Sequence, residues 1–152
     1  MGFFDFLKDA GQDLSAEQAR IDEEKAEKAK ALALKGQIEL LGLKVDGLDV
    51  GFDDGVATVS GTVPDQQEAE KVVLVLGNIQ GVARVDDRLE VKAPAPAAVL
   101  YTVKSGDTLG AIAKAHYGSA SKYPVIFEAN TPMLKDPNKI YPGQVLRIPA
   151  LD

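Results

Sequence analysis

The chain has 152 residues, of which 45% are hydrophobic and 26% charged, a balance typical of a soluble globular protein with one domain or two small ones. It contains no cysteine and one histidine, which excludes a disulfide framework, thiol chemistry and a metal centre built from several histidines. No apolar run is long enough to span a bilayer, and the first residues lack a basic run and an unbroken apolar core, so we expect a cytoplasmic protein.

The two parts of the chain differ in charge. Residues 99–152 carry six Lys and Arg against four Asp and Glu, a net charge of +2, and residues 1–98 carry eleven against nineteen, a net charge of −8. An acidic first part argues against nucleic acid or an anionic membrane as the main partner, although it is compatible with attracting cations. We expect a monomer that binds no nucleic acid and inserts into no membrane.

A short aromatic segment opens the chain. Phe3 and Leu7 stand four residues apart and Gly11 can stop a helix, which predicts a helix over residues 3–10 whose apolar side docks elsewhere on the protein. The last carbonyl oxygens of a helix lack partners and lie at the negative end of its dipole. Leu7 to Ala10 would therefore present oxygens to a cation if the docked helix pointed at one. Membrane contact is the weaker alternative.

A long helix is predicted from Ser15 to about Leu41. Ser15 fits a capping box, and Leu34 and Ile38 belong to a stripe that faces a core. Residues 23–30 are polar nearly all round, which indicates a solvated helix surface or a loosely ordered connector.

A β-hairpin follows. Asp54-Gly55 is a type I′ turn signal, and taking it as the loop places the apolar residues of both strands on one face. A calcium loop formed by the surrounding aspartates is an alternative, but it lacks the required spacing of acids and the closing Glu. The predicted pairs are Asp53–Val56, Phe52–Ala57, Gly51–Thr58, Val50–Val59 and Leu48–Gly61.

A second helix and a third strand complete this part. Asp65 is expected to cap the helix, with Glu68 reaching back to it, and the strand is expected to run from Val82 to Val91. Helix, hairpin, helix and strand make a compact α+β layer. The core stripe of the helix consists of Ala69, Val72, Val73 and Leu76.

The turn from Gly77 to Gly81 separates that helix from the strand. Two glycines four residues apart, with Asn78 between them, let the backbone turn sharply and leave carbonyl groups without ladder partners. The turn can be a helix C-cap in which Gly77 or Asn78 is left-handed, or a place where bare carbonyls coordinate a weakly hydrated cation. The spacing alone favours the C-cap.

Roughly residues 30–92 resemble a BON domain, on the hairpin end Val59-Ser60-Gly61-Thr62-Val63-Pro64, the helix after it and the return strand from Gly81-Val82 to Val85. Alternating Ala and Pro then indicate an extended linker. We therefore expect a leader helix at 1–14, a BON domain with its preceding helix on a three-stranded mixed sheet at 15–92, a linker at 93–98 and a second small domain at 99–152.

The second domain resembles LysM, a βααβ fold, on Tyr101-Thr102-Val103-Lys104-Ser105-Gly106-Asp107-Thr108-Leu109 and on Ile140-Tyr141-Pro142-Gly143-Gln144-Val145-Leu146-Arg147-Ile148-Pro149. His116 ends its first helix and is expected to be an ordinary surface or capping residue. LysM domains bind glycans that contain N-acetylglucosamine. The resemblance implies a glycan site at Gly106, Asp107, Thr108, Leu109, Ile140 and Tyr141.

The whole chain is similar to bacterial BON–LysM potassium-binding proteins. The motifs that carry this closer match are Lys8-Asp9-Ala10-Gly11, Gly77-Asn78-Ile79, Val85-Asp86-Asp87, Lys104-Ser105-Gly106-Asp107-Thr108-Leu109 and Phe127-Glu128-Ala129-Asn130. The resemblance implies a K⁺ site of main-chain oxygens, which suit a large, weakly hydrated ion and would also accept Rb⁺ or Cs⁺. The candidate oxygens belong to Leu7, Ala10, Gly77, Ile79 and Gly81, and a further carbonyl or water must complete the shell.

The implied function is that of a cytoplasmic K⁺ sensor or buffer, in which the ion orders the BON domain and changes its relation to LysM. The alternative is a peptidoglycan-binding protein of the cell envelope, which the missing export signal disfavours. An enzyme is not expected, because no nucleophile, metal set or pair of acids emerges from the sequence.

Overall fold

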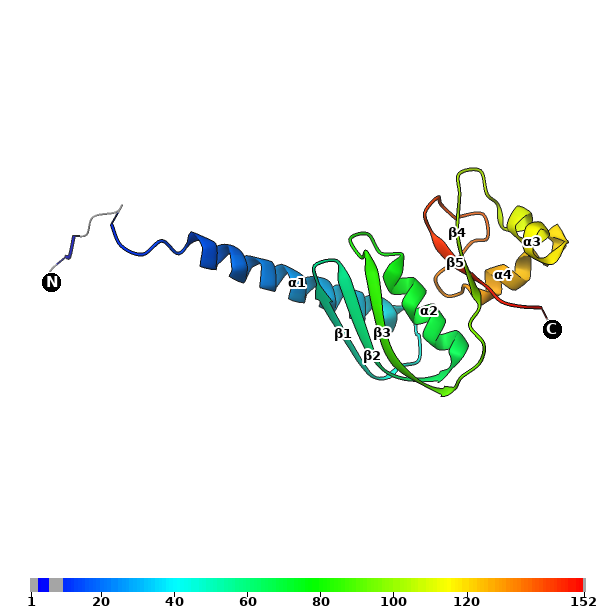
Figure 1. Cartoon of the computed structure of the whole chain (residues 1–152), viewed down its shortest axis with the longest axis horizontal. Coiled ribbons are helices and arrows are strands. Elements are labelled where there is room, and N and C mark those ends of the chain that lie inside the picture. Colours follow the sequence, from blue (N-terminus) through cyan, green and yellow to red (C-terminus); the bar gives the residue numbers. More distant parts are fainter. Residues whose placement is uncertain (1–2, 6–9, 152) are drawn as a thin grey trace.

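The computed structural model describes residues 3–5 and 10–151, and these form two α+β units in succession (Figure 1). The elements of the first unit are α1 (Ser15–Leu40), β1 (Asp46–Asp53), β2 (Val56–Asp65), α2 (Gln66–Gly77) and β3 (Arg84–Ala93). Those of the second are β4 (Val99–Thr102), α3 (Leu109–Tyr117), the short 3₁₀ helix η1 (Ala120–Lys122), α4 (Tyr123–Ala129) and β5 (Val145–Ile148).

The first unit is a three-stranded mixed sheet with α1 and α2 packed on one face. The strand order is β1-β2-β3, with β1 antiparallel and β3 parallel to β2. The expected hairpin and mixed sheet are therefore confirmed. The parallel pair needs a crossover, which α2 provides. Both helices bury apolar side chains against the sheet in one shared core, whose fully buried members include Leu34, Ile38, Val59, Val72 and Leu76.

The hairpin register is confirmed over its first four pairs, from Asp53–Val56 to Val50–Val59. Asp54 and Gly55 both have positive φ, 46° and 80°, as a type I′ turn requires. The fifth expected pair, Leu48–Gly61, is wrong, because the register shifts between Asp46 and Asp49. Gly61 has a φ of +137°, and a Cβ there would lie 2.6 Å from the side chain of Val45, so this close approach bends the strand pair.

Helix α2 begins as the sequence predicts, with the Asp65 side chain accepting a 2.8 Å hydrogen bond from the backbone N–H of Glu68. The Glu68 carboxylate accepts instead from the backbone N–H of Lys44, at 2.8 Å. Beyond the expected stripe, Leu74 and Val75 are also buried. Because α2 packs between the sheet of the first unit and β5 of the second (Figure 1), it has two buried sides.

The second unit has the βααβ order expected of LysM. Strands β4 and β5 pair antiparallel, and α3 and α4 pack beside them. The Thr108 hydroxyl caps α3 by accepting from the backbone N–H of Ala111 at 3.0 Å. Leu109, Ile112 and Ile126 are buried in the core of this unit.

The segment before α1 differs from the expectation. Residues 3–5 and 10–14 are not helical, and Phe3 and Phe4 are 95% and 85% exposed, so the described part of the predicted 3–10 helix neither forms nor docks. Ser15 is the first residue of α1 rather than its cap, and its N–H donates to the Asp13 carboxylate. The first half of α1 projects from the sheet (Figure 1), and Ile21 is the one large apolar residue in it.

Candidate functional site

The glycine turn after α2 has the geometry of an open loop. The backbone N–H of Asn78 donates to Leu74 O at 3.0 Å and closes the helix. Asn78 has a φ of −90° and Gly77 is not in the positive region, so the expected left-handed C-cap at either residue is wrong. The left-handed residue is Gly81, with φ +95°, which turns the chain into β3.

The carbonyl oxygens of this turn differ in how they are satisfied. Ile79 O accepts from the backbone N–H of Val82 at 3.1 Å, and Gln80 O accepts from the ammonium of Lys30 at 2.7 Å. Within the part of the chain that the structure describes, the oxygens of Gly77 and Gly81 have no recorded hydrogen bond. A carbonyl oxygen has two lone pairs, so all four oxygens can accept a further partner.

Helix α1 ties this turn to the hairpin turn beside it. The Glu27 carboxylate accepts from the backbone N–H of Asp54 at 2.8 Å, and Gly55 O accepts from the backbone N–H groups of Ala83 and Arg84. The Asp54 N–H favours the ionised form of Glu27, but the Asp53 carboxyl and desolvation outweigh it and raise the pKa of Glu27. The carboxyl groups of Glu27 and Asp53 therefore lie close together beside the hairpin turn.

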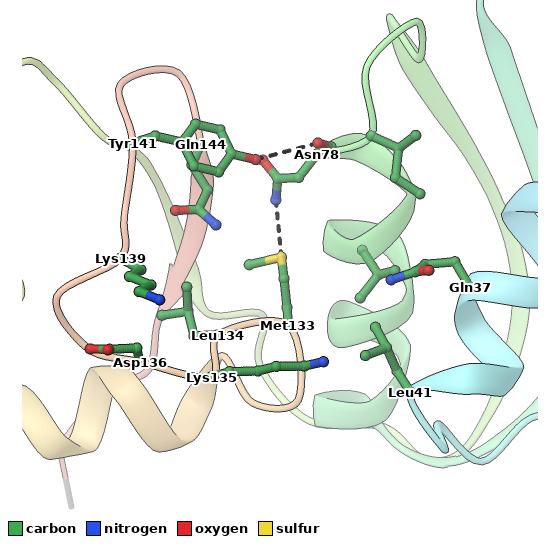
Figure 2. Close-up of a pocket in the computed structure, with 12 residues that line it drawn as sticks. Gln37, Leu41, Asn78, Met133, Leu134, Lys135, Asp136, Lys139, Tyr141 and Gln144 are labelled. Carbon is green, nitrogen blue, oxygen red and sulfur yellow. Dashed lines mark hydrogen bonds between the residues drawn. The ribbon is translucent and has the colours of Figure 1, made fainter.

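The side chain of Asn78 joins the turn to the second unit. Its Nδ2 donates to Val145 O at 2.9 Å and its Oδ1 accepts from Val145 N at 2.8 Å, so it pairs with β5 as a neighbouring strand would. The Tyr141 hydroxyl lies 3.4 Å from Asn78 O, as Figure 2 shows. The backbone of the candidate cation turn and the edge of β5 are thus held together by one amide side chain.

A cavity of about 400 Å³ lies beside this contact, between the two units (Figure 2). The side-chain oxygen of Gln144 in its wall is buried and has no hydrogen-bond partner in the described chain. Asn78 and Ile79 of the turn also line the cavity, so a change in the turn would alter its shape. Its other lining residues are Gln37, Leu41, Val75, Met133, Leu134, Lys135, Asp136, Lys139 and Tyr141.

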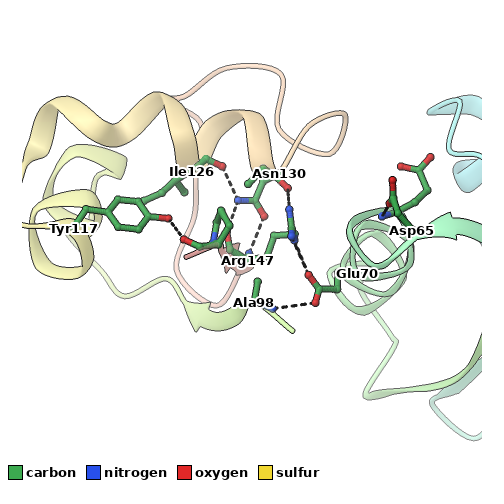
Figure 3. Close-up of polar contacts among 10 residues, drawn as sticks. Asp65, Glu70, Ala98, Tyr117, Ile126, Asn130 and Arg147 are labelled. Atoms are coloured by element: carbon green, nitrogen blue, oxygen red, sulfur yellow. Dashed lines mark hydrogen bonds and ion pairs between the residues drawn. The ribbon is translucent and has the colours of Figure 1, made fainter. Parts of the chain in front are cut away.

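A second contact joins the N-terminal half of α2 to β5 (Figure 3). Arg147 donates from Nε and Nη2 to Glu70 Oε1, both at 3.0 Å, and the two side chains are only 8% and 11% exposed. Arg147 Nη1 also donates to Ala129 O at 3.1 Å, and Glu70 Oε2 accepts from the backbone N–H of Ala98. The buried amide of Asn130 pairs with both backbone groups of Arg147 and fixes the strand that carries it.

The structure brings together only part of the predicted ion site. Gly77, Ile79 and Gly81 lie in one turn, whereas Ala10 is exposed in the segment before α1, and Figure 1 shows that segment apart from α2 and β3, which the turn joins. Leu7 lies outside the described residues. The hydrogen bond between the Lys30 ammonium and the Gln80 carbonyl was not expected. Nothing in the sequence distinguishes Lys30 from the other lysines of α1.

The residues expected for glycan binding have structural partners in this fold. The Asp107 carboxylate accepts from the Tyr101 hydroxyl at 2.5 Å and from the Lys104 N–H at 2.8 Å, and these two bonds lower its pKa. Thr108 caps α3, and Leu109 is buried. The three others in that set are Gly106, with φ +87°, Ile140, which packs against the core of the second unit, and Tyr141, which faces Asn78.

Side chains do not supply a metal centre in the described residues, since no three of their acidic and histidine groups gather closely enough to hold an ion. His116 lies edge-on to Tyr101, with ring centroids 5.5 Å apart. None of the described helices combines the length and apolar character needed to cross a bilayer.

Comparison with known proteins agrees with the two-part architecture. A BON domain matches residues 26–93 and a LysM domain matches residues 101–149. The chain is 47% identical to the potassium binding protein Kbp of Escherichia coli O6:H1, over 98% of this chain and 99% of that protein. It is 30% identical to an uncharacterized protein of Deinococcus radiodurans, over 85% of this chain and 53% of that protein.

One solved structure shares a more distant likeness. CdsD, a structural protein of the type III secretion system of Chlamydia trachomatis, is 23% identical, with a TM-score of 0.38, over 53% of this chain and 46% of its own. BON and LysM are not enzymatic families, and the protein is accordingly not an enzyme. With near-complete coverage at 47% identity, the chain belongs to the family of BON–LysM proteins that includes the potassium binding protein Kbp.

Proposed function

We propose that the protein is a cytoplasmic K⁺ sensor or buffer whose ion site is the turn from Gly77 to Gly81. The observation that carries the proposal is that this turn already receives a cationic group, because Gln80 O accepts from the Lys30 ammonium at 2.7 Å. The neighbouring oxygens of Gly77 and Gly81 have no recorded partner in the described chain. The name of the relative from Escherichia coli supports K⁺ as the ion.

The chemistry of the turn suits a weakly hydrated monovalent ion. Uncharged carbonyl oxygens can replace the water shell of K⁺, whereas Ca²⁺ and Mg²⁺ sites use carboxylates. The glycines at both ends of the turn leave its backbone uncovered by side chains. We expect Gly77, Ile79 and Gly81 to supply ligands, and Rb⁺ or Cs⁺ to substitute for K⁺.

The leader supplies the other proposed ligands, Leu7 and Ala10, and α1 limits how closely they approach the turn. At ~1.5 Å per residue, Ser15 and Lys30 are about 22 Å apart along the helix. The chain from Ala10 to Ser15 spans about 17 Å when fully extended. A fully extended leader would thus bring Ala10 near the turn only at the limit of its reach, and bending or partial unwinding of the polar first half of α1 would shorten the distance.

The first half of α1 is suited to such a change. Its residues are mostly exposed, and the hydrogen bonds of Glu27, at its end, and of Lys30, just beyond it, join the helix to the adjacent turns. A helix that is polar nearly all round gains little from packing and has a low free energy of opening. Ordering of the leader by K⁺ would stabilise the BON domain by mass action.

The Asn78 side chain provides a route from the ion to the LysM domain. Its two hydrogen bonds to Val145 join the backbone that would close on K⁺ to the edge of β5. A ligand shifts a conformational equilibrium only by its difference in affinity for the two states. We propose that closure of the turn moves Asn78, and so changes the relation of the two domains.

Calorimetric titration of the full chain with potassium, sodium and calcium chlorides tests the function. We expect saturable heat with K⁺, little heat with Na⁺ or Ca²⁺, and a K⁺-dependent change in small-angle scattering. The absence of potassium binding would contradict the proposal.

A glycan-binding LysM protein is the second candidate, favoured by the LysM match over residues 101–149. The same preparation can be titrated with chitin and peptidoglycan fragments. Binding of a fragment without any response to K⁺ would favour this candidate, with Gly106, Thr108 and Tyr141 as the first residues to vary.

A further inference from the structure

We propose that Lys30 is a tethered competitor of K⁺, whose ammonium binds the ion-binding turn and sets the K⁺ concentration at which the protein responds. This inference rests on the proposed function and concerns a residue outside the expected ligand set. It begins from one contact, the hydrogen bond of 2.7 Å from Lys30 Nζ to Gln80 O.

The Lys30 ammonium lies beside Gly81 of this turn. Gly81 has a φ of +95° and no side chain, and a Cβ at that position would lie 3.5 Å from Lys30 Nζ. The alkyl stem lies along the turn, since the Lys30 Cε would be 3.7 Å from the same Cβ. The positive φ favours glycine at this position, whereas a Cβ at these distances would make only ordinary van der Waals contact with Lys30.

The anchor of α1 fixes Lys30 in reach of the turn. Glu27 lies one helical turn earlier on the same face and accepts from the backbone N–H of Asp54 at 2.8 Å. The hairpin turn also bonds the chain after Gly81, because Gly55 O accepts from the backbone N–H of Ala83 at 2.8 Å. The ammonium is thus delivered by a helix that is bonded to both loops around the site.

Competition follows from charge and from shared acceptors. Lys30 is the residue whose ammonium donates to this turn in the described chain, and its bond uses an oxygen between two proposed ligands, Ile79 and Gly81. A second positive charge within several ångströms is repelled, and carbonyl oxygens can both accept hydrogen bonds from an ammonium group and coordinate K⁺. Binding of K⁺ would therefore displace Lys30 and release α1 from one of its two loop contacts.

The test replaces Lys30 in the full chain and measures the Kd for potassium chloride by calorimetry, with choline chloride holding the ionic strength constant. Lys30→Met keeps the stem and removes the charge, and we expect it to tighten K⁺ binding about three- to tenfold. Lys30→Arg keeps the charge and should bind nearly as the unmodified chain does. Lys25→Met is the matched control, because it makes the same change in net charge on an exposed part of α1, and we expect less than a twofold effect.

The outcomes separate the two proposals. Equal Kd values for the Lys30→Met and Lys25→Met proteins, with K⁺ still binding, would overturn the competition and leave the ion site standing. No potassium heat in any of the four proteins would overturn the proposed function and the competition with it.

A second measurement follows the ammonium itself. In the ¹⁵N-labelled protein we expect the Nζ signal of Lys30, and not that of Lys25, to move as K⁺ saturates the site. An unchanged Lys30 signal at saturating K⁺ would overturn the competition even if the Kd changed.

Discussion

Helix α2 meets the LysM domain at two places that differ in chemistry. Near its start, Glu70 and Arg147 form a buried ion pair whose remaining polar atoms bond Ala98 and Ala129. Past its end, Asn78 makes neutral hydrogen bonds to Val145 from a turn whose carbonyls include two without recorded partners in the described chain. The polar atoms of the first contact have hydrogen-bond partners, which suits it to hold α2 against β5. The second contact belongs to a turn whose backbone a ligand can rearrange.

These two contacts would allow α2 both to fix the two domains together and to transmit a change between them. Removing one partner of a buried, hydrogen-bonded ion pair is strongly destabilising, so the Glu70–Arg147 pair fixes one end of α2 against β5. A half-buried amide pair costs less to shift and adjoins the proposed ion site. We therefore expect rotation about the Glu70 contact, with most movement at Asn78, when K⁺ binds.

The largest effect is expected from Glu70→Gln, which leaves the Arg147 charge buried beside a neutral partner. We expect a loss of about 3 kcal/mol in the free energy of unfolding, measured by denaturant titration. The exposed Glu90→Gln is the control for loss of a carboxylate, and should change stability by less than about 0.5 kcal/mol. A Glu70→Gln protein as stable as the control would show that this contact does not hold the domains together.

A smaller loss, about 2 kcal/mol, is expected from Asn78→Ala, because two half-buried backbone groups of Val145 lose their partners. The variant should still bind K⁺, but the change in small-angle scattering on adding K⁺ should shrink. Gln80→Ala is the control in the same turn, since its side chain is exposed. An undiminished scattering change in Asn78→Ala would exclude this side chain as the link.

The two glycines of the turn should respond in opposite directions. Gly81→Ala places a side chain at φ +95° and should cost about 1 kcal/mol, with weaker K⁺ binding. Gly77→Ala meets only Val85 at an ordinary 3.6 Å, and a residue at a helix end should gain up to about 0.5 kcal/mol. Thermal unfolding measures both, and a Gly81→Ala protein with unchanged stability and Kd would argue against the geometry of this turn.

The smallest effect concerns the LysM domain alone and its dependence on pH. The Tyr101 hydroxyl and the Lys104 N–H lower the pKa of Asp107 in the folded protein. Its stabilising contribution is therefore present above the unfolded pKa, near ~4, and is lost as the pH falls through the folded value. Asp107→Asn should lower the melting temperature slightly at pH 7, and the difference should shrink as the pH falls through the folded pKa of Asp107. A difference that stays constant down to acidic pH would contradict this.

The fold followed from local signals where these agreed with packing. The Asp54-Gly55 turn predicted the hairpin register. The Asp65 cap predicted where α2 begins, and its apolar stripe predicted which side of the helix faces the core. The register failed at Gly61, where a close backbone approach rather than the hydrophobic pattern decides the pairing. The burial of Leu74 was not predicted, because Asn130 and Met133 of the other domain lie beside it. Val75 was not in the expected stripe either, although it belongs to the core of the first unit.

The candidate site was predictable only in its backbone part. A turn bounded by Gly77 and Gly81 indicates exposed carbonyls, but no pattern in the sequence selects Lys30 from the other lysines of α1 or pairs Glu70 with Arg147. These partners lie 50 and 77 residues apart in the chain, and their contacts depend on how helices and domains pack. The expected docking of Leu7 and Ala10 remains a prediction about the potassium-bound protein.

The most direct test of the central claim is a crystal structure of the full chain grown in potassium chloride, with anomalous data collected near the potassium absorption edge. The proposal predicts one strong peak coordinated by the oxygens of Gly77, Ile79 and Gly81, with Leu7 and Ala10 against it and Lys30 displaced. A peak elsewhere in a protein that binds K⁺ in solution, or a peak at the turn with residues 7–10 far from it, would contradict the account.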